Sequence, residues 1–203
     1  ELLDAFKEPK LRTLVSHFRP IDGGSIDLPM LESALMKALF DETFAFIQKE
    51  QPGASKGLTE IFGTRADLYN LKILWREKKN FNASPDIVRL LLLQRGYKLK
   101  WKQLNALAEV KKEEDILAFL EQCPYHIHLG KDAESIEIQC ERILLRMLKR
   151  QIAFSSNPSV VLAAYAGLCD LEVENIITII EGVRYQNPAE QIRQYIVVEL
   201  EEK

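Results

Sequence analysis

Two acid–amide pairs are the first residues whose types and spacing could do chemistry. Asp67 and Asn70 lie three residues apart, as do Glu172 and Asn175. Residues at this spacing share one face of a helix, so a carboxylate and an amide could together orient a substrate or move a proton. Capping and the helix dipole explain an acid in a first helical turn equally well, and hydrogen bonds to nearby backbone explain an amide among apolar residues. We therefore interpret all four residues as structural.

A second set with chemical potential is the group formed by Cys123, His126 and His128. It could begin a metal site, but no second pair of ligands accompanies it at a typical spacing. The sequence also contains no nucleophile elbow and no phosphate-binding Gly-rich loop. We therefore expect no catalytic residue, no metal, no cofactor and no direct small-molecule substrate.

Basic side chains are concentrated in the middle of the chain. The net charge is −3 overall, but it is +8 over residues 65–112 and −8 over residues 113–203. Our candidate contacts to a partner are Arg65, Lys72, Arg76 and Lys79. The acidic part would repel a long polyanion, so we predict no nucleic acid and favour an acidic protein partner or a membrane surface approached from one side. An ordinary solvated helix surface explains the same charges.

The elements that must position these residues are helices. The 203 residues are 47% hydrophobic and 28% charged, as in soluble globular proteins, and apolar residues recur at spacings of three and four. No hairpin signal occurs, so we predict an all-α fold with no sheet. The predicted helices span about 31–47, 56–62, 65–79, 85–96, 100–110, 112–122, 133–154, 159–167, 172–185 and 189–198. Gly63 should end one helix and Thr64 should cap the next.

Three further features indicate where the protein works. The longest apolar runs are shorter than the roughly 20 residues that span a bilayer. The three cysteines form no disulfide framework, which favours a reducing compartment and a cytoplasmic location. The first residue is Glu, so we expect that the chain begins within a longer polypeptide.

The second half of the sequence repeats the first. Residues 67–71 (DLYNL) align with residues 172–176 (EVENI), and the apolar positions that follow stay in register. A proline begins the next predicted helix after each motif, at Pro85 and Pro188. Duplicated helical units bury each other's faces and usually form a scaffold with a shaped surface. We divide residues 26–203 into a first repeat (26–125) and a second repeat (126–203).

These residues resemble a known family, the C subunits of the V-type (A/V-type) rotary ATPases and ATP synthases, which are similar to the d subunit of the vacuolar ATPase. The likeness rests on residues 67–76 (DLYNLKILWR), on Ala164 and Tyr165 leading into residues 172–176, and on closing segments 180–185 and 188–193. It covers about residues 31–198. The second copy has Ile177 and Glu181 in place of Lys72 and Arg76, so the basic contacts are not transferred to it.

The resemblance implies a funnel-like stack of helical repeats, three in a complete protein of this family, of which this chain holds two. We therefore expect residues 1–25 to be the remnant of a preceding repeat. It implies a non-catalytic element of the central stalk, peripheral on the cytoplasmic face of the membrane. Such an element would be a socket between the shaft subunits D and F and the membrane rotor ring of c/K-type subunits, in a machine that transports protons or sodium ions. Two other classes stay open. A general α-helical repeat adaptor would explain the repeat and the charges, and a helical enzyme would need convergent ionisable residues in a closed pocket.

Overall fold

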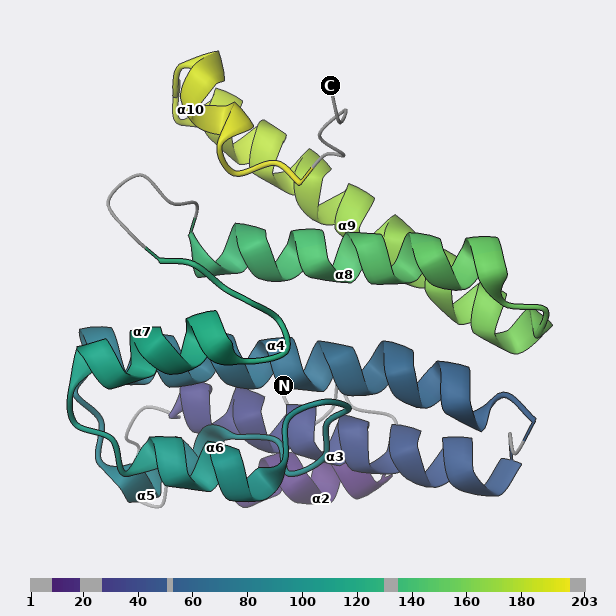
Figure 1. Ribbon diagram of the computed structural model, residues 1–203, viewed down its shortest axis with the longest axis horizontal. Coiled ribbons are helices and arrows are strands. Elements are labelled where there is room, and N and C mark those ends of the chain that lie inside the picture. Colours follow the sequence, from purple (N-terminus) through teal and green to yellow (C-terminus); the bar gives the residue numbers. More distant parts are fainter. Residues whose placement is uncertain (1–8, 19–26, 51–52, 130–134, 198–203) are drawn as a thin grey trace.

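The computed structural model describes residues 9–18, 27–50, 53–129 and 135–197, and within these ranges the chain forms helices and no strand (Figure 1). The prediction of an all-α fold is therefore confirmed. The helices are α2 (Pro9–Ser16), α3 (Leu28–Glu50), α4 (Ser55–Asn80), α5 (Pro85–Leu91), α6 (Trp101–Ala108), α7 (Glu113–Gln122), α8 (Ile136–Phe154), α9 (Pro158–Arg184) and α10 (Ala189–Arg193). None of these described helices is both long and apolar enough to cross a membrane. Most of the predicted N-terminal remnant, residues 1–8 and 19–25, lies outside the described residues.

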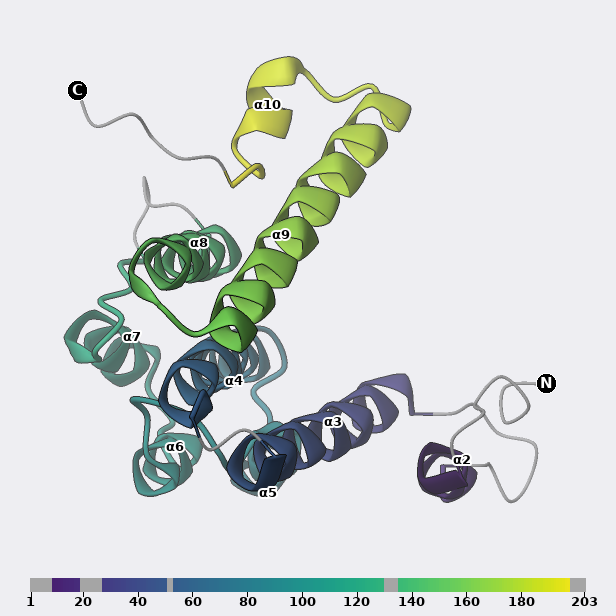
Figure 2. The same ribbon diagram turned by 90° about the vertical axis from the view of Figure 1, so that its right-hand side faces the viewer.

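Helix α4 lies at the centre of the arrangement. It contacts α3, α5, α6, α7, α8 and α9. Figure 1 shows α8 and α9 along one side of α4 and α3 along the other. In Figure 2, α3 and α9 diverge from α4, so that the C-terminal half of α9 projects away with α10 beside it. Residues on α4 are thus placed to meet side chains from the helices on both of its sides.

Three groups of buried apolar side chains hold these helices together. Leu71 and Leu74 of α4 belong to the largest, which also includes residues of α5, α6, α7 and α8. Ile61 and Leu148 belong to a second group that joins α4 to α8 and α9, and Phe40 belongs to a third that joins α3 to α4. Burying one such side chain contributes roughly 1.5–3 kcal/mol, so α4 stabilises both halves of the molecule.

The sequence-based boundary at Gly63 and Thr64 is wrong, because α4 runs without interruption from Ser55 to Asn80. An isolated glycine inside a helix costs only about 1 kcal/mol relative to alanine. Close packing offsets that cost here, since a Cβ on Gly63 would lie 2.8 Å from the Cβ of Tyr97. Thr64 is buried rather than at a helix start. Its hydroxyl interacts with that of Tyr125.

The predicted break near Gly167 is wrong for a similar reason, because α9 is one helix from Pro158 to Arg184. Gly167 is buried against Leu148 of α8, and the N-terminal half of α9 packs against α8. Asn157 caps α9, and its side-chain oxygen accepts hydrogen bonds from the amides of Ser159 and Val160. Packing against α8 therefore stabilises α9 at Gly167, and the helix continues past this residue.

Two other helices end earlier than predicted. Helix α5 ends at Leu91 rather than near residue 96, and α10 ends at Arg193 rather than near residue 198, a position outside the described residues. Leu93 follows α5, and its backbone N–H and C=O groups form hydrogen bonds with the side chain of Asn70. Val197 follows α10 and forms the same two bonds with the side chain of Asn175. These backbone groups are therefore satisfied without a longer helix.

Candidate functional site

Asn70 and Asn175 make the same pair of hydrogen bonds in the two repeats. The Asn70 amide nitrogen donates to the Leu93 carbonyl at 2.8 Å, and its oxygen accepts from the Leu93 amide at 2.7 Å. Asn175 does the same with Val197, at 2.9 Å and 2.8 Å. Asn70 is fully buried, whereas Asn175 is half-buried. Each amide thus attaches the long helix of its repeat to the segment that follows the next short helix.

Asp67 is buried in the middle of α4, so its predicted position in a first helical turn is wrong. Its Oδ2 accepts hydrogen bonds from the amides of Tyr97, Lys98 and Leu99 at 3.1, 2.7 and 3.1 Å, and from the Tyr125 hydroxyl at 2.7 Å. Burial raises the pKa of Asp67, although these hydrogen bonds oppose the rise. A Cβ on residue 96 would lie 1.8 Å from Oδ1, so only glycine fits there.

Glu172 differs from Asp67, its counterpart in the second repeat, because it is exposed to solvent. The two acids therefore occupy equivalent positions in very different surroundings. The four residues of the acid–amide pairs lie apart as two separate couples on α4 and α9 and do not converge on a common cavity.

The four predicted partner contacts do share one face of α4. Arg65, Lys72, Arg76 and Lys79 are spaced by seven, four and three residues, which places them in one stripe along the helix. Arg65 and Lys72 are half-buried, whereas Arg76 and Lys79 are exposed. The stripe therefore runs from the packed centre of the molecule to its surface.

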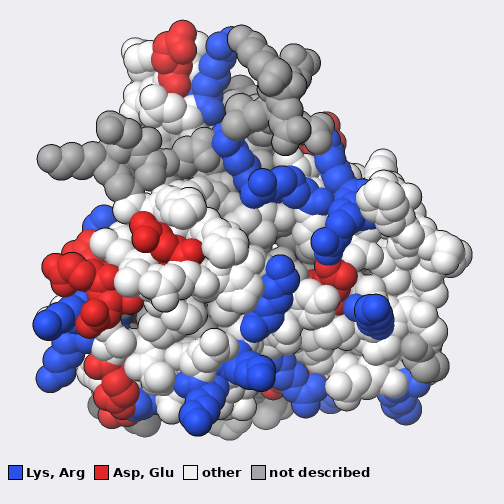
Figure 3. Space-filling model, in the orientation of Figure 1, with Lys and Arg blue, Asp and Glu red and all other residues white. Residues whose placement is uncertain are grey.

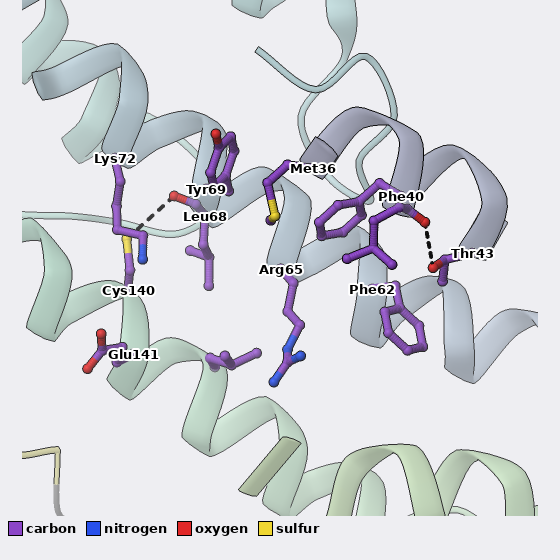
Figure 4. A pocket seen from close by; sticks show the side chains of 12 residues that line it. Met36, Phe40, Thr43, Phe62, Arg65, Leu68, Tyr69, Lys72, Cys140 and Glu141 are labelled. Atoms are coloured by element: carbon purple, nitrogen blue, oxygen red, sulfur yellow. Dashed lines mark hydrogen bonds between the residues drawn. The ribbon is translucent and has the colours of Figure 1, made fainter. Parts of the chain in front are cut away.

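Arg65 and Lys72 line a groove of about 290 Å³ between α3, α4 and α8 (Figure 4). Each helix contributes side chains from one face. The lining residues are Met36, Leu39, Phe40 and Thr43 of α3, Phe62, Arg65, Leu68, Tyr69 and Lys72 of α4, and Cys140, Glu141 and Leu144 of α8. The surface is mainly apolar, with charged groups from α4 and α8, and it suits the apolar side of another helix.

One charged group of the groove, Arg65, already has an ion-pair partner, and the others influence one another through their charges. Arg65 forms an ion pair with Asp170 of α9, with Nη2 and Oδ2 2.8 Å apart. Figure 4 shows Lys72 extending toward Cys140, with Glu141 on the next position of α8. Burial raises the pKa of Glu141 and raises that of Cys140 to about 12, and the positive charge of Lys72 opposes both pKa shifts. Cys140 is therefore a thiol at neutral pH and not a nucleophile.

Arg76 and Lys79 lie beyond the groove on the same face of α4. The Arg76 Nε lies 3.3 Å from the Glu77 carboxylate, and the Lys79 ammonium sits 4.6 Å from the centre of the Trp75 ring. Half of the Arg76 side chain is still accessible. Both cations can therefore reach a partner that extends past the groove.

The residues that α3, α8 and α9 bring to this face were not predicted from the sequence. Asp170 could have been found, because it stands 105 residues after Arg65, at the same position of the repeat. The apolar lining from α3 and α8 carries no sequence signal that separates it from the core. In the described part of the chain, no three His, Cys, Asp or Glu residues are arranged to bind a metal ion.

A family model and two individual proteins that resemble this chain all represent the same kind of ATP synthase subunit. The family model of the ATP synthase (C/AC39) subunit matches residues 1–195. The C subunit of the A-type ATP synthase of Methanocaldococcus jannaschii is 24% identical over 177 residues, 83% of this chain and 43% of the relative. That of Methanosphaera stadtmanae is 22% identical over 180 residues, 82% of this chain and 46% of the relative. This chain spans less than half the length of either relative. On the match over almost its whole length, the chain belongs to the ATP synthase (C/AC39) subunit family.

Proposed function

We propose that this chain is part of a non-catalytic central-stalk component of an A/V-type rotary ATP synthase. In this proposal it forms a socket that couples the shaft subunits D and F to the membrane rotor ring of c/K-type subunits, peripherally on the cytoplasmic face. The machine transports protons or sodium ions. The chain contributes rigid packing and a shaped surface to this process rather than a reacting group.

The observation that carries this proposal is the groove between α3, α4 and α8 together with the cationic stripe on α4. A shaft made of helices would bury an apolar side in the groove, and its acidic side chains would meet Arg76 and Lys79. Contacts of this kind bind specifically and are weakened by salt. The groove is built on α4, which packs against both repeats, so a torque applied there reaches the whole helical stack through close-packed side chains.

Titration calorimetry of this chain with a purified D–F pair tests the proposal. We expect saturable binding that weakens as salt is raised. The variant R76E/K79E should bind about tenfold more weakly or worse, since two charge reversals at exposed positions remove favourable pairs and add repulsive ones.

The matched control is K102E/K111E, which makes the same change of net charge at exposed positions outside the groove. It should bind like the unchanged chain. Absence of saturable binding, or equal weakening in both variants, would overturn the proposal. Binding of unrelated amphipathic helices with the same affinity would favour a general repeat adaptor instead.

A further inference from the structure

A second groove lies on the opposite face of the α4–α8 layer. It has a volume of about 290 Å³ and is lined by Glu60 and Thr64 of α4, Lys98, Pro124 and Tyr125 of two loops, and Ile143, Arg146, Met147 and Arg150 of α8. We call it the basic groove. On α8, Arg146 and Arg150 point to the opposite side of the helix from Glu141 and Leu144, which line the first groove. The two grooves therefore present separate surfaces.

Charge in the basic groove is unbalanced. Three of its lining residues are cations and one is an acid, Glu60, which already pairs with Arg150. Arg146 is exposed and has no ion-pair partner among the described residues. Figure 3 shows Lys and Arg side chains gathered over α8 and the adjoining part of α4, around a small acidic area. The groove thus presents positive charge that the described part of the protein leaves uncompensated.

Each cation is attached to a packed part of the molecule, although Lys98 itself lies in a loop. The backbone amide of Lys98 donates to the buried carboxylate of Asp67, and its ammonium lies 5.1 Å from the centre of the Tyr125 ring. Arg146 and Arg150 are one turn apart on α8, which packs against α4 and α9. Because these positions are fixed before binding, a ligand would lose less free energy in ordering them.

We propose that the basic groove binds an acidic segment of a partner protein, at a site separate from the groove that faces the shaft. Carboxylates of the segment would pair with Arg146, Lys98 and the accessible side of Arg150. The aliphatic parts of its Asp or Glu side chains would contact Ile143 and Met147. A membrane surface fits less well, because Ile143 is half-buried and Met147 is buried, so neither projects as an anchor into lipid.

The test is fluorescence anisotropy of a labelled decaglutamate peptide titrated with this chain, with vesicles containing phosphatidylserine examined in parallel. We expect peptide binding that weakens with salt, and about a tenfold or greater loss of affinity in K98E/R146E. The control K102E/K111E carries the same charge change on α6 and in the loop before α7 and should keep the affinity. Circular dichroism would verify that both variants remain helical.

Three results would overturn the proposal: no binding of the peptide, equal loss in both variants, or binding to the vesicles but not to the peptide. The variant R76E/K79E, designed for the shaft contact, should bind decaglutamate normally. A failure of the shaft proposal and a failure of this one are therefore distinguishable.

Discussion

Arg65 and Asp170 stand at equivalent positions of the two repeats, 105 residues apart, and their side chains meet at 2.8 Å. The pair joins α4 to α9, so each of these two long helices contributes one charge to the contact between them. The Arg65 side chain is 27% exposed and that of Asp170 is 65% exposed. Partial exposure allows solvent to screen the pair, so its contribution is modest.

A double-mutant cycle with R65A and D170A should give a coupling energy of about 0.5–1 kcal/mol in urea unfolding. The comparison pair is Lys10 and Glu42, whose side chains are 78% and 50% exposed and whose coupling should be near zero. A coupling at the junction no larger than that of the comparison pair would contradict the role assigned to Arg65 and Asp170.

The two asparagines should differ in their effect on stability. Replacing Asn70 with alanine leaves both backbone groups of Leu93 buried without their partner, which should cost about 2–3 kcal/mol of unfolding free energy. The same change at Asn175 should cost about 1 kcal/mol, because that site is half-buried and water can replace the amide. Urea unfolding of N70A and N175A measures how much unfolding free energy each variant loses. Equal losses would show that burial of the asparagine does not determine how much its hydrogen bonds stabilise the fold.

Asp67 should make stability depend on pH. Burial raises its pKa in the folded protein above the ordinary value of 3.8, so the folded state holds the proton more tightly than the unfolded state. The stability contributed by protonation is therefore present below 3.8 and is lost as pH rises through the raised pKa. The D67N variant has an amide at this position, which does not titrate.

The unfolding free energy of the unchanged chain relative to D67N should accordingly fall as pH rises from about 4 through the raised pKa of Asp67. Urea unfolding of both proteins at several pH values gives this difference directly. A difference that stays constant, or that grows with pH, would mean that hydrogen bonds from Tyr97, Lys98, Leu99 and Tyr125 outweigh burial.

The three cysteines should react unequally with Ellman's reagent. Cys123 and Cys140 are buried, and burial raises the pKa of Cys140 to about 12, whereas Cys169 on α9 is partly exposed. We expect one rapidly reacting thiol in the folded protein and three after unfolding. A C169S variant should lose the rapid reaction, and a rapid reaction that persists there would show that α4 and α8 separate more readily than this packing allows.

Local sequence patterns predicted the helical fold because apolar spacing and capping residues act within a few positions of one another. Ser84 caps α5 and Asn157 caps α9 through side-chain oxygens, as helix starts require. The helix boundary predicted at Gly63 was wrong because the role of this glycine depends on its packing against Tyr97, a residue of a distant loop. The position of Asp67 was misjudged for the same reason, since three of its hydrogen-bond donors lie about 30 residues away.

The candidate site was predictable only in part. The cationic stripe could be read from the spacing of Arg65, Lys72, Arg76 and Lys79 on one helix. The groove could not, because α3, α4 and α8 must first pack before Phe40 and Leu144 face the same space. Phe40 is itself part of the buried core, and the sequence context of Leu144 does not distinguish it from core residues. Tertiary packing, rather than any local motif, forms this surface.

Photo-crosslinking from the groove tests the central claim most directly. Benzoylphenylalanine would replace Leu39, which lines the groove and is 57% exposed, or Leu90 of α5, which is 54% exposed and does not line it. With the D–F pair present, we predict crosslinks to a shaft protein from position 39 and not from position 90. Crosslinks from position 90 alone, or from neither position in a complex that binds, would contradict the assignment of this groove as the shaft socket.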